Sequence, residues 1–579
     1  MRLPLVSLLV LLLRQNNVVR SYNDKPEEWY QRYTSYPPYC STPEEMNTRS
    51  IPPLRVEDRN VYGETRILHV TAVIRHGART PWTSSEDCFP KVSSGTEWNC
   101  RLTTIMTPPN FEDGDSLFLF EKQYDALPYQ KDGLSNELNG TCQVGQLLLR
   151  GYEQEFQNGQ FLKDAYTYQS DSYDHDERMR LIDISDKEYS AWSPKQLRYR
   201  ADNDQRTIMS GQVLLRGLFG EQVQQYVWDT DNYPTIPLHI ADRERDIVGP
   251  NSKVCPKLKD ISKLAKQSPE YQAFDNSQES KDVRNFLKEK VGEMDQNTLL
   301  DCLMTTICTD RELPDDVNDY GKENSWFQAL ADYDVQSYNL VMKYNNSEYA
   351  KLGMGPLWAE ILETWDLFLE GEFFFQSGPP LTPSSNTSDT EETIIPPRLS
   401  VYSGHDTTIM PLLASISPNL WNDTDWAPYA SMMLIEIHEF IDGWTDSSRF
   451  TSSYAFRLIY NGKILTPSVP GCPADLELCD LMVLKNIVEP FATRSQDCAS
   501  ADNNDEKVVD QAKKIMSTNE GISMFLGLLL GGVLLGACGT HVFLTGTFFG
   551  SRVLSSAVQE DIYARSGLQD CFEDEFIRN

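Results

Sequence analysis

The chain has 579 residues, of which 40% are hydrophobic, and it is long enough for one large domain with a substantial insertion or for two domains. Its formal net charge of -33 is unusually acidic. Such a surface argues against a nucleic-acid partner, because phosphate backbones are bound by clustered Lys and Arg. The charge fits solubility through self-repulsion or an acidic compartment.

The N-terminus has the pattern of a secretory signal peptide, predicted over residues 1–21. Arg2 gives a basic start, and residues 3–13 are apolar but too few to span a bilayer comfortably. The alternative is an uncleaved signal anchor. Residues 22–65 are then a lumenal extension that precedes the first core strand.

Residues 522–550 form a second apolar stretch without any Asp, Glu, Lys or Arg. About 20 such residues cross a bilayer, so this stretch predicts a transmembrane helix after a polar stalk at 493–521. With a cleaved signal, the protein is a single-pass type I membrane protein with its large domain lumenal or extracellular, in the lysosome or endosome or at the cell surface. Small-xxx-small glycine pairs in the span suggest a homodimer, and the tail 551–579 suggests cytosolic sorting adaptors.

Cysteines and glycosylation signals agree with the secretory pathway. Ten of the twelve cysteines precede the apolar stretch, an even number suited to disulfides in an oxidising lumen. Four Asn-x-Ser/Thr sequons predict glycosylation at Asn139, Asn345, Asn386 and Asn422.

The periodicity of the central region predicts an α/β core. Residues 67–74 form an apolar run typical of a strand buried on both faces of a sheet, and 399–402 form a second short strand. Residues 207–219 have a helical pattern. Residues 257–375 are helix-rich without clear strands, which favours a mainly helical insertion, and the Pro/Ser/Thr-rich segment 376–397 is expected to be a mobile loop.

The first strand is followed directly by the sequence Arg75-His76-Gly77-Ala78-Arg79. Ligands bind at the carboxyl ends of strands in open α/β sheets, and arginine presents a planar fork suited to phosphate oxygens. The histidine there is suited to act as a base, a nucleophile or a metal ligand. A surface turn with incidental cations is the alternative.

The second strand is followed by His405 and Asp406 at the start of a predicted helix, where backbone N–H groups favour a bound phosphate. Asp406 is equally suited to be a helix N-cap. A third piece, Arg200, lies six residues before the start of another helix, and alone it is only a surface arginine.

Together these motifs resemble the histidine acid phosphatases. RHGARTP resembles the family's RHGxRxP signature, SGHDTT its distal His-Asp motif and RADNDQRTIMSG its RSTDxxRTxxS segment, in the same order along the chain. The chain departs where the family has Ser-Thr-Asp after the arginine, because it has Ala201-Asp202-Asn203, which puts the hydrogen bonding of Arg200 in doubt.

The resemblance implies a phosphoglycerate-mutase-like α/β core sheet flanked by helices, with a mainly helical cap. It divides the chain into a first core part at 66–256, the cap at 257–375, the loop at 376–397 and a second core part at 398–492. It also implies a short disulfide between Cys472 and Cys479.

The implied reaction is the hydrolysis of phosphate monoesters at acidic pH through a phosphohistidine on His76, with Asp406 as the proton donor and no metal or cofactor. Phosphate would be held by Arg75, Arg79, Arg200 and His405. The alternatives are a phytase or lysophosphatidate-type phosphatase of the same fold, or a receptor-like or sorting protein with reduced catalysis.

Overall fold

The computed structural model describes residues 29–82, 98, 100, 105–106, 120–121, 138, 140–169, 176–184, 196–230, 234–291, 296–369, 396–441, 451–492 and 498. The chain divides into two compact units, Met1–Cys498 and Ala499–Asn579, and the second lies outside these residues. So do the predicted signal peptide, the apolar stretch 522–550 and the tail. Within the described ranges, every helix is too short or too polar to traverse a bilayer.

A mixed sheet forms the centre of the first unit, in the order β11-β10-β9-β1-β8-β6-β7, with β12 pairing β10. The long strand β1 (Thr65–Arg75) runs parallel to β8 (Leu399–Gly404) and antiparallel to β9 (Met432–Phe440). On the β8 side the sheet continues in parallel with β6 and β7, and on the β9 side it continues as a hairpin. These remaining strands are β6 (Leu197–Ala201), β7 (Leu238–His239), β10 (Tyr454–Tyr460), β11 (Lys463–Ile464) and β12 (Cys479–Asp480).

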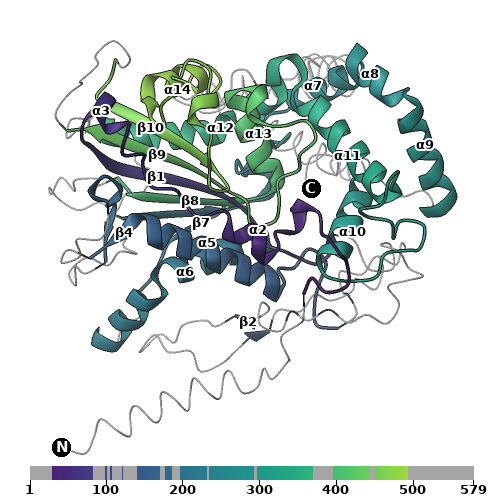
Figure 1. The fold of residues 1–579 in the computed structure, drawn as a ribbon, viewed down its shortest axis with the longest axis horizontal. Helices are drawn as coiled ribbons and strands as arrows, with labels where there is room; N and C mark the ends of the chain where they lie inside the picture. Colours follow the sequence, from purple (N-terminus) through teal and green to yellow (C-terminus); the bar gives the residue numbers. More distant parts are fainter. Residues whose placement is uncertain are drawn as a thin grey trace, which may run out of the picture. The chain divides into compact units, whose positions relative to one another are not determined.

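Helices cover both faces of this sheet (Figure 1), and alternate residues of β1 supply the two cores. Val70, Ala72 and Ile74 pack against the face covered by α5 (Leu149–Tyr166) and α6 (Gln205–Thr230). Val73 packs on the opposite face, as the period of two in a strand requires. That face is covered by α12 (Tyr344–Leu369), α13 (Asp406–Ile416) and α14 (Leu481–Val488). The predicted α/β core with flanking helices is confirmed.

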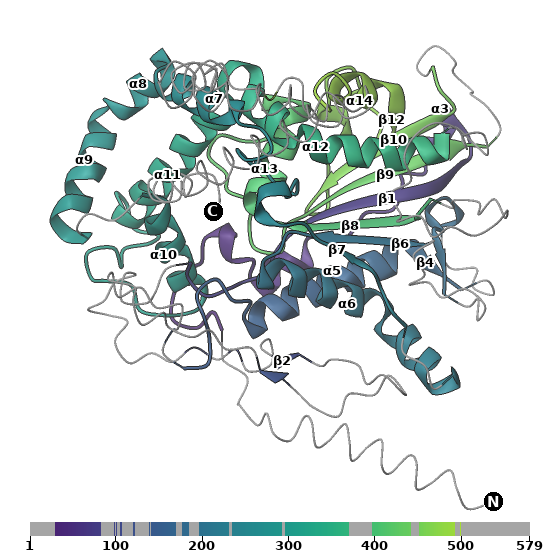
Figure 2. The ribbon, with the colours of Figure 1, turned by 180° about the vertical axis from the view of Figure 1, so that it is seen from behind.

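A second group of helices lies beyond the ends of the parallel strands, as both views show (Figures 1 and 2). It has its own apolar core, to which Phe286, Leu303, Phe327 and Leu330 contribute. The members are α7 (Lys257–Lys266), α8 (Pro269–Asp275), α9 (Gln278–Phe286), the π-helical turn η4 (Leu287–Val291), α10 (Gln296–Cys308) and α11 (Trp326–Met342). They correspond to the predicted helical insertion, whereas α12 at its end packs directly on the sheet.

Short elements complete the described part of the fold. Before β1 lie η1 (Pro38–Cys40), α2 (Pro43–Asn47) and α3 (Arg59–Tyr62). Two small sheets pair β2 (Ile105–Met106) with β3 (Phe120–Glu121), and β4 (Thr167–Tyr168) with β5 (Ile182–Asp183). Three short 3₁₀ turns lie at Glu177–Met179, Arg243–Arg245 and Pro418–Leu420, and a fourth lies at Thr466–Ser468.

Disulfides close both short and long segments of the first unit. Cys472 and Cys479 are joined, seven residues apart, in the pairing that the resemblance implied. Three further bridges join Cys40 to Cys308, Cys100 to Cys142 and Cys255 to Cys498. The sequon residues Asn345 and Asn422 are exposed, and Asn139 and Asn386 lie outside the described residues.

Candidate active site

The sheet brings the predicted motifs together at the carboxyl ends of its parallel strands. β1 ends at Arg75, which is level with Gly404 at the end of β8. The next strand, β6, ends at Ala201, level with Ser403. The backbone N–H of His76 donates to the carbonyl of Gly404 at 3.0 Å, so the two histidine motifs are joined directly.

His76 is buried and its surroundings favour a neutral ring. Its Nδ1 lies 2.8 Å from the carbonyl oxygen of Gly77, and because a carbonyl only accepts, Nδ1 must carry the proton. That tautomer leaves a lone pair on Nε2. Burial, together with the positive charges of Arg75 and Arg206, holds the pKa of His76 well below its ordinary value. Neutral imidazole nitrogen is a competent nucleophile.

Three buried arginines surround this histidine and leave donors unused. The Nε atoms of Arg75, Arg79 and Arg206 are buried without a hydrogen-bond partner in the part of the chain that the structure describes, and so is the hydroxyl of Tyr429. Unpaired buried donors are costly, so such a group is expected where a ligand completes the hydrogen bonding. Guanidinium donors around an imidazole nucleophile fit a phosphoryl group.

Each arginine is also fixed by a carboxylate from a different element. Arg75 pairs with Asp406 at 2.9 Å, Arg79 with Asp301 of α10 at 2.8 Å, and Arg206 with Asp204 at 2.9 Å. Asp301 also accepts from the backbone N–H of Trp82 at 2.7 Å. The helical insertion therefore reaches the motif loop through Asp301, which no sequence pattern indicated.

Asp406 is the first residue of α13, and its carboxylate is bound on both oxygens. One oxygen accepts from Arg75 and from the indole Nε1 of Trp426 at 2.8 Å, and the other accepts from the backbone N–H of Thr407 at 2.8 Å. Burial alone would raise the pKa of Asp406, but Arg75 and His405 outweigh burial and lower it. Without a bound anion, Asp406 is therefore an ionised carboxylate.

His405 lies beside His76, with ring centroids 5.4 Å apart, yet its surroundings favour the opposite charge state. Its Nε2 is hydrogen-bonded to Asp202 and lies 3.5 Å from Asp204. Burial would lower the pKa of His405, but the two carboxylates raise it to about 9. His405 is thus an imidazolium at neutral pH, suited to binding an anion.

Arg200, predicted to bind phosphate, is paired with a carboxylate of the helix that covers the sheet. Arg198 and Arg200 are two residues apart on β6 and share a face of the strand, and both pair with Glu360 of α12 at 2.8 and 2.7 Å. Arg206, in the first turn of α6, occupies the site instead. Its position after the end of a strand and at a helix N-terminus was the available signal.

One group of described residues has ligand atoms close enough together for a metal ion, namely Asp202, Asp204 and His405, within 4.8 Å of one another. A histidine binds a metal through an unprotonated nitrogen, so a metal ion there would have to displace the proton from the nitrogen of His405 that faces the two carboxylates.

The residues that form this site lie mostly within a stretch of the chain that matches a known family. Residues 66–461 match the model of the histidine phosphatase superfamily (branch 2). The chain belongs to this superfamily. The predicted class of enzyme, a phosphoric monoester hydrolase, is thereby confirmed, as is the resemblance on which it was based.

Two curated members of this superfamily cover most of the matched region. The chain is 24% identical over 440 residues to lysophosphatidic acid phosphatase type 6 of Bos taurus, covering 75% of this chain and 85% of that protein. It is 25% identical over 380 residues to lysosomal acid phosphatase of Homo sapiens, covering 64% of this chain and 74% of that protein. A solved phytase of Hafnia alvei is 13% identical, covers 75% of this chain and 98% of the phytase, and has a TM-score of 0.39.

One contact of the site comes from outside the residues that match the family model. Residues 36–42 precede the matched residues 66–461, yet Tyr39 contacts Arg75. No sequence pattern indicated this contact, because the segment carries no motif and is joined to the site only through the fold.

Proposed function

We propose that the protein is an acid phosphatase that hydrolyses phosphate monoesters through a phosphohistidine on His76. The observation that carries the proposal is the neutral, buried imidazole of His76 among three arginine Nε donors that have no hydrogen-bond partner within the described part of the chain. A phosphoryl group placed there would satisfy the buried donors and lie against the nucleophile.

In the proposed first step, Nε2 of His76 attacks phosphorus, the P–N bond forms and the P–O bond to the alcohol breaks. Arg75, Arg79, Arg206 and the imidazolium of His405 bind the non-bridging oxygens, whose charge they stabilise. A protonated Asp406 gives its proton to the leaving oxygen. In the second step Asp406 accepts a proton from water, which attacks phosphorus and releases His76 and phosphate.

This role requires that Asp406 be protonated when substrate is bound, although Arg75 lowers its pKa in the free site. A bound phosphate anion adds negative charge beside the carboxylate and draws on the same arginine, and both effects raise the pKa. Acidic pH adds to this effect, which supports an acid phosphatase.

The charges of the site favour a substrate with one phosphoryl group. Four cationic groups surround His76 and four carboxylates pair with them, so the described site is close to neutral before substrate binds. A phytase would need further cations for further phosphates. A lysophosphatidate-type substrate remains the second candidate, because Trp82 is 38% exposed beside Arg206 and offers an apolar surface.

We also propose that the protein is a single-pass type I membrane protein with this domain lumenal. The support is the signal pattern, the apolar stretch 522–550, and the exposed sequon residues Asn345 and Asn422. Glycosidase treatment of the expressed chain should increase its gel mobility. A membrane-inserted chain without such a shift would contradict the topology. A receptor-like role with reduced catalysis is less favoured, because the site retains both His76 and Asp406.

The test of the mechanism compares His76→Ala with Asp406→Asn. The first removes the nucleophile, so we expect no phosphoenzyme and a loss of activity of roughly 10⁶-fold, the scale at which a lost nucleophile acts. The second removes the acid, so the loss should be roughly 10²–10⁴-fold for an alkyl phosphate and much smaller for p-nitrophenyl phosphate.

The measurement is rapid-quench trapping of an acid-labile, base-stable phosphoenzyme with substrates of graded leaving-group pKa. A His76→Ala variant that still forms phosphoenzyme would contradict the mechanism. Equal losses for all substrates in Asp406→Asn would show that this carboxylate positions phosphate and is not the acid.

A further inference from the structure

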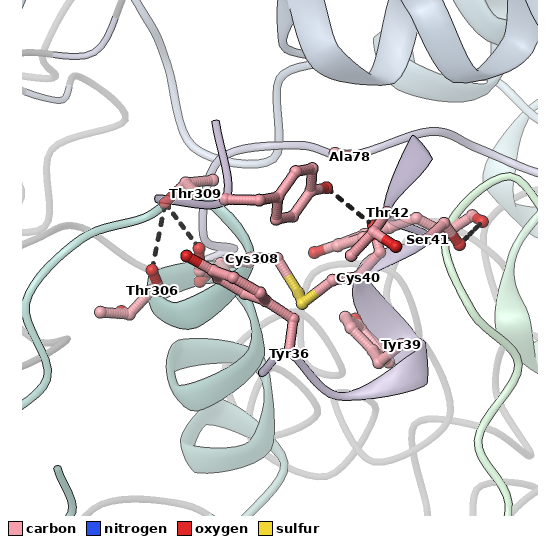
Figure 3. Close-up of a disulfide and its surroundings, with 12 residues drawn as sticks. Tyr36, Tyr39, Cys40, Ser41, Thr42, Ala78, Thr306, Cys308 and Thr309 are labelled. Atoms are coloured by element: carbon pink, nitrogen blue, oxygen red, sulfur yellow. Dashed lines mark hydrogen bonds between the residues drawn. A yellow bond between two sulfur atoms is a disulfide. The ribbon is translucent and has the colours of Figure 1, made fainter. Parts of the chain in front are cut away.

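The segment Pro37–Thr42 lies between the helical insertion and the site, although it precedes residues 66–461, which match the family model. A disulfide joins its Cys40 to Cys308 at the end of α10, as Figure 3 shows. Tyr39 is the adjacent residue and is 6% exposed. This disulfide joins residues 268 positions apart and fixes the segment against the helical insertion.

The segment is also bound to the loop that carries Tyr429. The backbone N–H of Tyr429 donates to the carbonyl of Tyr39 at 3.0 Å, and the hydroxyl of Ser41 donates to the carbonyl of Tyr429 at 2.5 Å. From α5, the amide of Gln154 donates to the carbonyls of Cys40 and Ser41 at 3.0 and 2.9 Å. Tyr39 therefore has a defined position, set by contacts with separate parts of the core.

That position places Tyr39 on Arg75. Nη2 of Arg75 donates to the hydroxyl of Tyr39 at 2.7 Å and pairs with Asp406 at 2.9 Å. The guanidinium carbon lies 4.5 Å from the ring centroids of both Tyr39 and Tyr429, whose centroids are 4.6 Å apart, so the cation lies against both aromatic rings on one side. Nη1 donates to the carbonyl of Ala427, which leaves Nε as the free donor.

Two groups thus lie close to one nitrogen of Arg75. The hydroxyl of Tyr39 accepts a hydrogen bond from Nη2, whereas Asp406 lies 2.9 Å from the same nitrogen as an ion-pair partner without hydrogen-bond geometry. Without the hydroxyl, one hydrogen would be buried without an acceptor, and the guanidinium would turn further toward Asp406. A tighter ion pair makes that carboxylate a weaker proton donor.

We propose that Tyr39 is a positioning residue of the active site, which holds the guanidinium of Arg75 so that Asp406 can act as the general acid. The inference deepens the proposed function and rests on it. The disulfide between Cys40 and Cys308 keeps Tyr39 in place. The segment Pro37–Thr42, which precedes residues 66–461, thereby contributes to the active site.

The test compares Tyr39→Phe with Tyr36→Phe. The first keeps the ring on Arg75 and removes the hydroxyl. The second removes the hydroxyl of the residue just before the segment. That hydroxyl is hydrogen-bonded to Asp310 and to the backbone N–H of Tyr33, away from the site. For Tyr39→Phe we expect kcat on an alkyl phosphate to fall roughly 10- to 100-fold, the effect of losing one hydrogen bond to a charged group. The fall with p-nitrophenyl phosphate should be less than about 3-fold, because that leaving group needs little protonation.

Tyr36→Phe should leave both rates within about 2-fold of the unmodified protein. A variant with Cys40→Ala and Cys308→Ala should show the same leaving-group dependence as Tyr39→Phe, since it releases the segment. Equal losses on both substrates, unchanged rates on both, or the same leaving-group dependence in Tyr36→Phe would overturn the inference.

Phosphoenzyme trapping distinguishes a failure of the proposed function from a failure of the inference on Tyr39. If the unmodified protein forms no phosphohistidine, the proposed function fails and this inference fails with it. If it forms one and Tyr39→Phe shows no leaving-group dependence, the inference alone fails.

Discussion

Two clusters of buried charge lie on the same sheet, and they are built differently. The first is the active site around His76. The second, here called the sheet cluster, consists of Glu436 and His438 on β9 with Arg457 on β10, all fully buried. In it Glu436 accepts from His438 at 2.9 Å and from the hydroxyl of Tyr166 at 2.6 Å, and lies 3.1 Å from Nε of Arg457.

The clusters share residue types but differ in how their charges are completed. In the sheet cluster Nε of Arg457 lies 3.1 Å from a carboxylate of the protein itself, as an ion pair without hydrogen-bond geometry. In the active site each of the three arginines meets its carboxylate through an Nη atom, and its Nε has no hydrogen-bond partner among the described residues. A buried charge that the protein pairs internally contributes to the fold, whereas one left with free donors is prepared for a ligand. Substitutions in the two clusters should therefore affect different properties.

The largest expected effect on stability comes from Glu436→Ala. It removes the nearer carboxylate partner of buried Arg457 and leaves Glu477 at 3.5 Å, and breaking a buried pair typically costs about 3–5 kcal/mol. The free energy of unfolding, from urea denaturation of the protein, measures this loss. The folded fraction should still form phosphoenzyme at low temperature. A stable variant that forms none would place Glu436 in the chemistry and break the comparison.

The next effect concerns activity and separates two arginines of one motif. Arg206→Ala should lower kcat/KM by roughly 10²–10³-fold, the scale of losing one donor to a transition-state oxygen. Arg200→Ala should lower it less than about 10-fold, because its partner is Glu360 outside the site. Steady-state kinetics with p-nitrophenyl phosphate measures both. The reverse order would restore Arg200 as the phosphate ligand.

The smallest effect is a shift in pH dependence on replacing Asp202 with Asn. Asp202 raises the pKa of His405 to about 9, so their ion pair is fully present below about 6.5 and is lost as the pH rises through about 9. Without Asp202, burial and Arg206 should bring the pKa of His405 to its ordinary value or below. Inhibition by sulfate, which stays a dianion throughout, should then weaken with rising pH already near neutrality. An unchanged pH dependence would show that Asp202 does not control the charge of His405.

Much of the α/β core could be predicted from the sequence, because its strands and helices have local hydrophobic patterns. The apolar run at 67–74 became the central part of β1. The helix predicted over 207–219 extends to Thr230 in the structure. The role of α12 could not be read, because its sequence does not reveal whether a helix packs on the sheet or on other helices.

The site could be predicted in part for the same reason. His76, Arg79 and Asp406 closely follow the ends of strands, so their positions in the sequence predict that they lie at one edge of the sheet. The pairing of Arg200 with Glu360 depends on the alternation of side chains along β6, which the motif alone does not reveal. Asp301 and Tyr39 reach the site from distant segments, and no local pattern marks such contacts.

The loop after β1 rests on α5 with almost no space between the two backbones. A methyl group on Gly77 would lie 2.3 Å from the carbonyl oxygen of Gly151, and one on Gly151 would lie 2.3 Å from that of Ala78. Any substitution at either glycine must therefore push the loop away from the helix. We therefore expect both glycines to be retained in variants of this enzyme that act on other substrates. Changes in substrate specificity should come from residues elsewhere around His76.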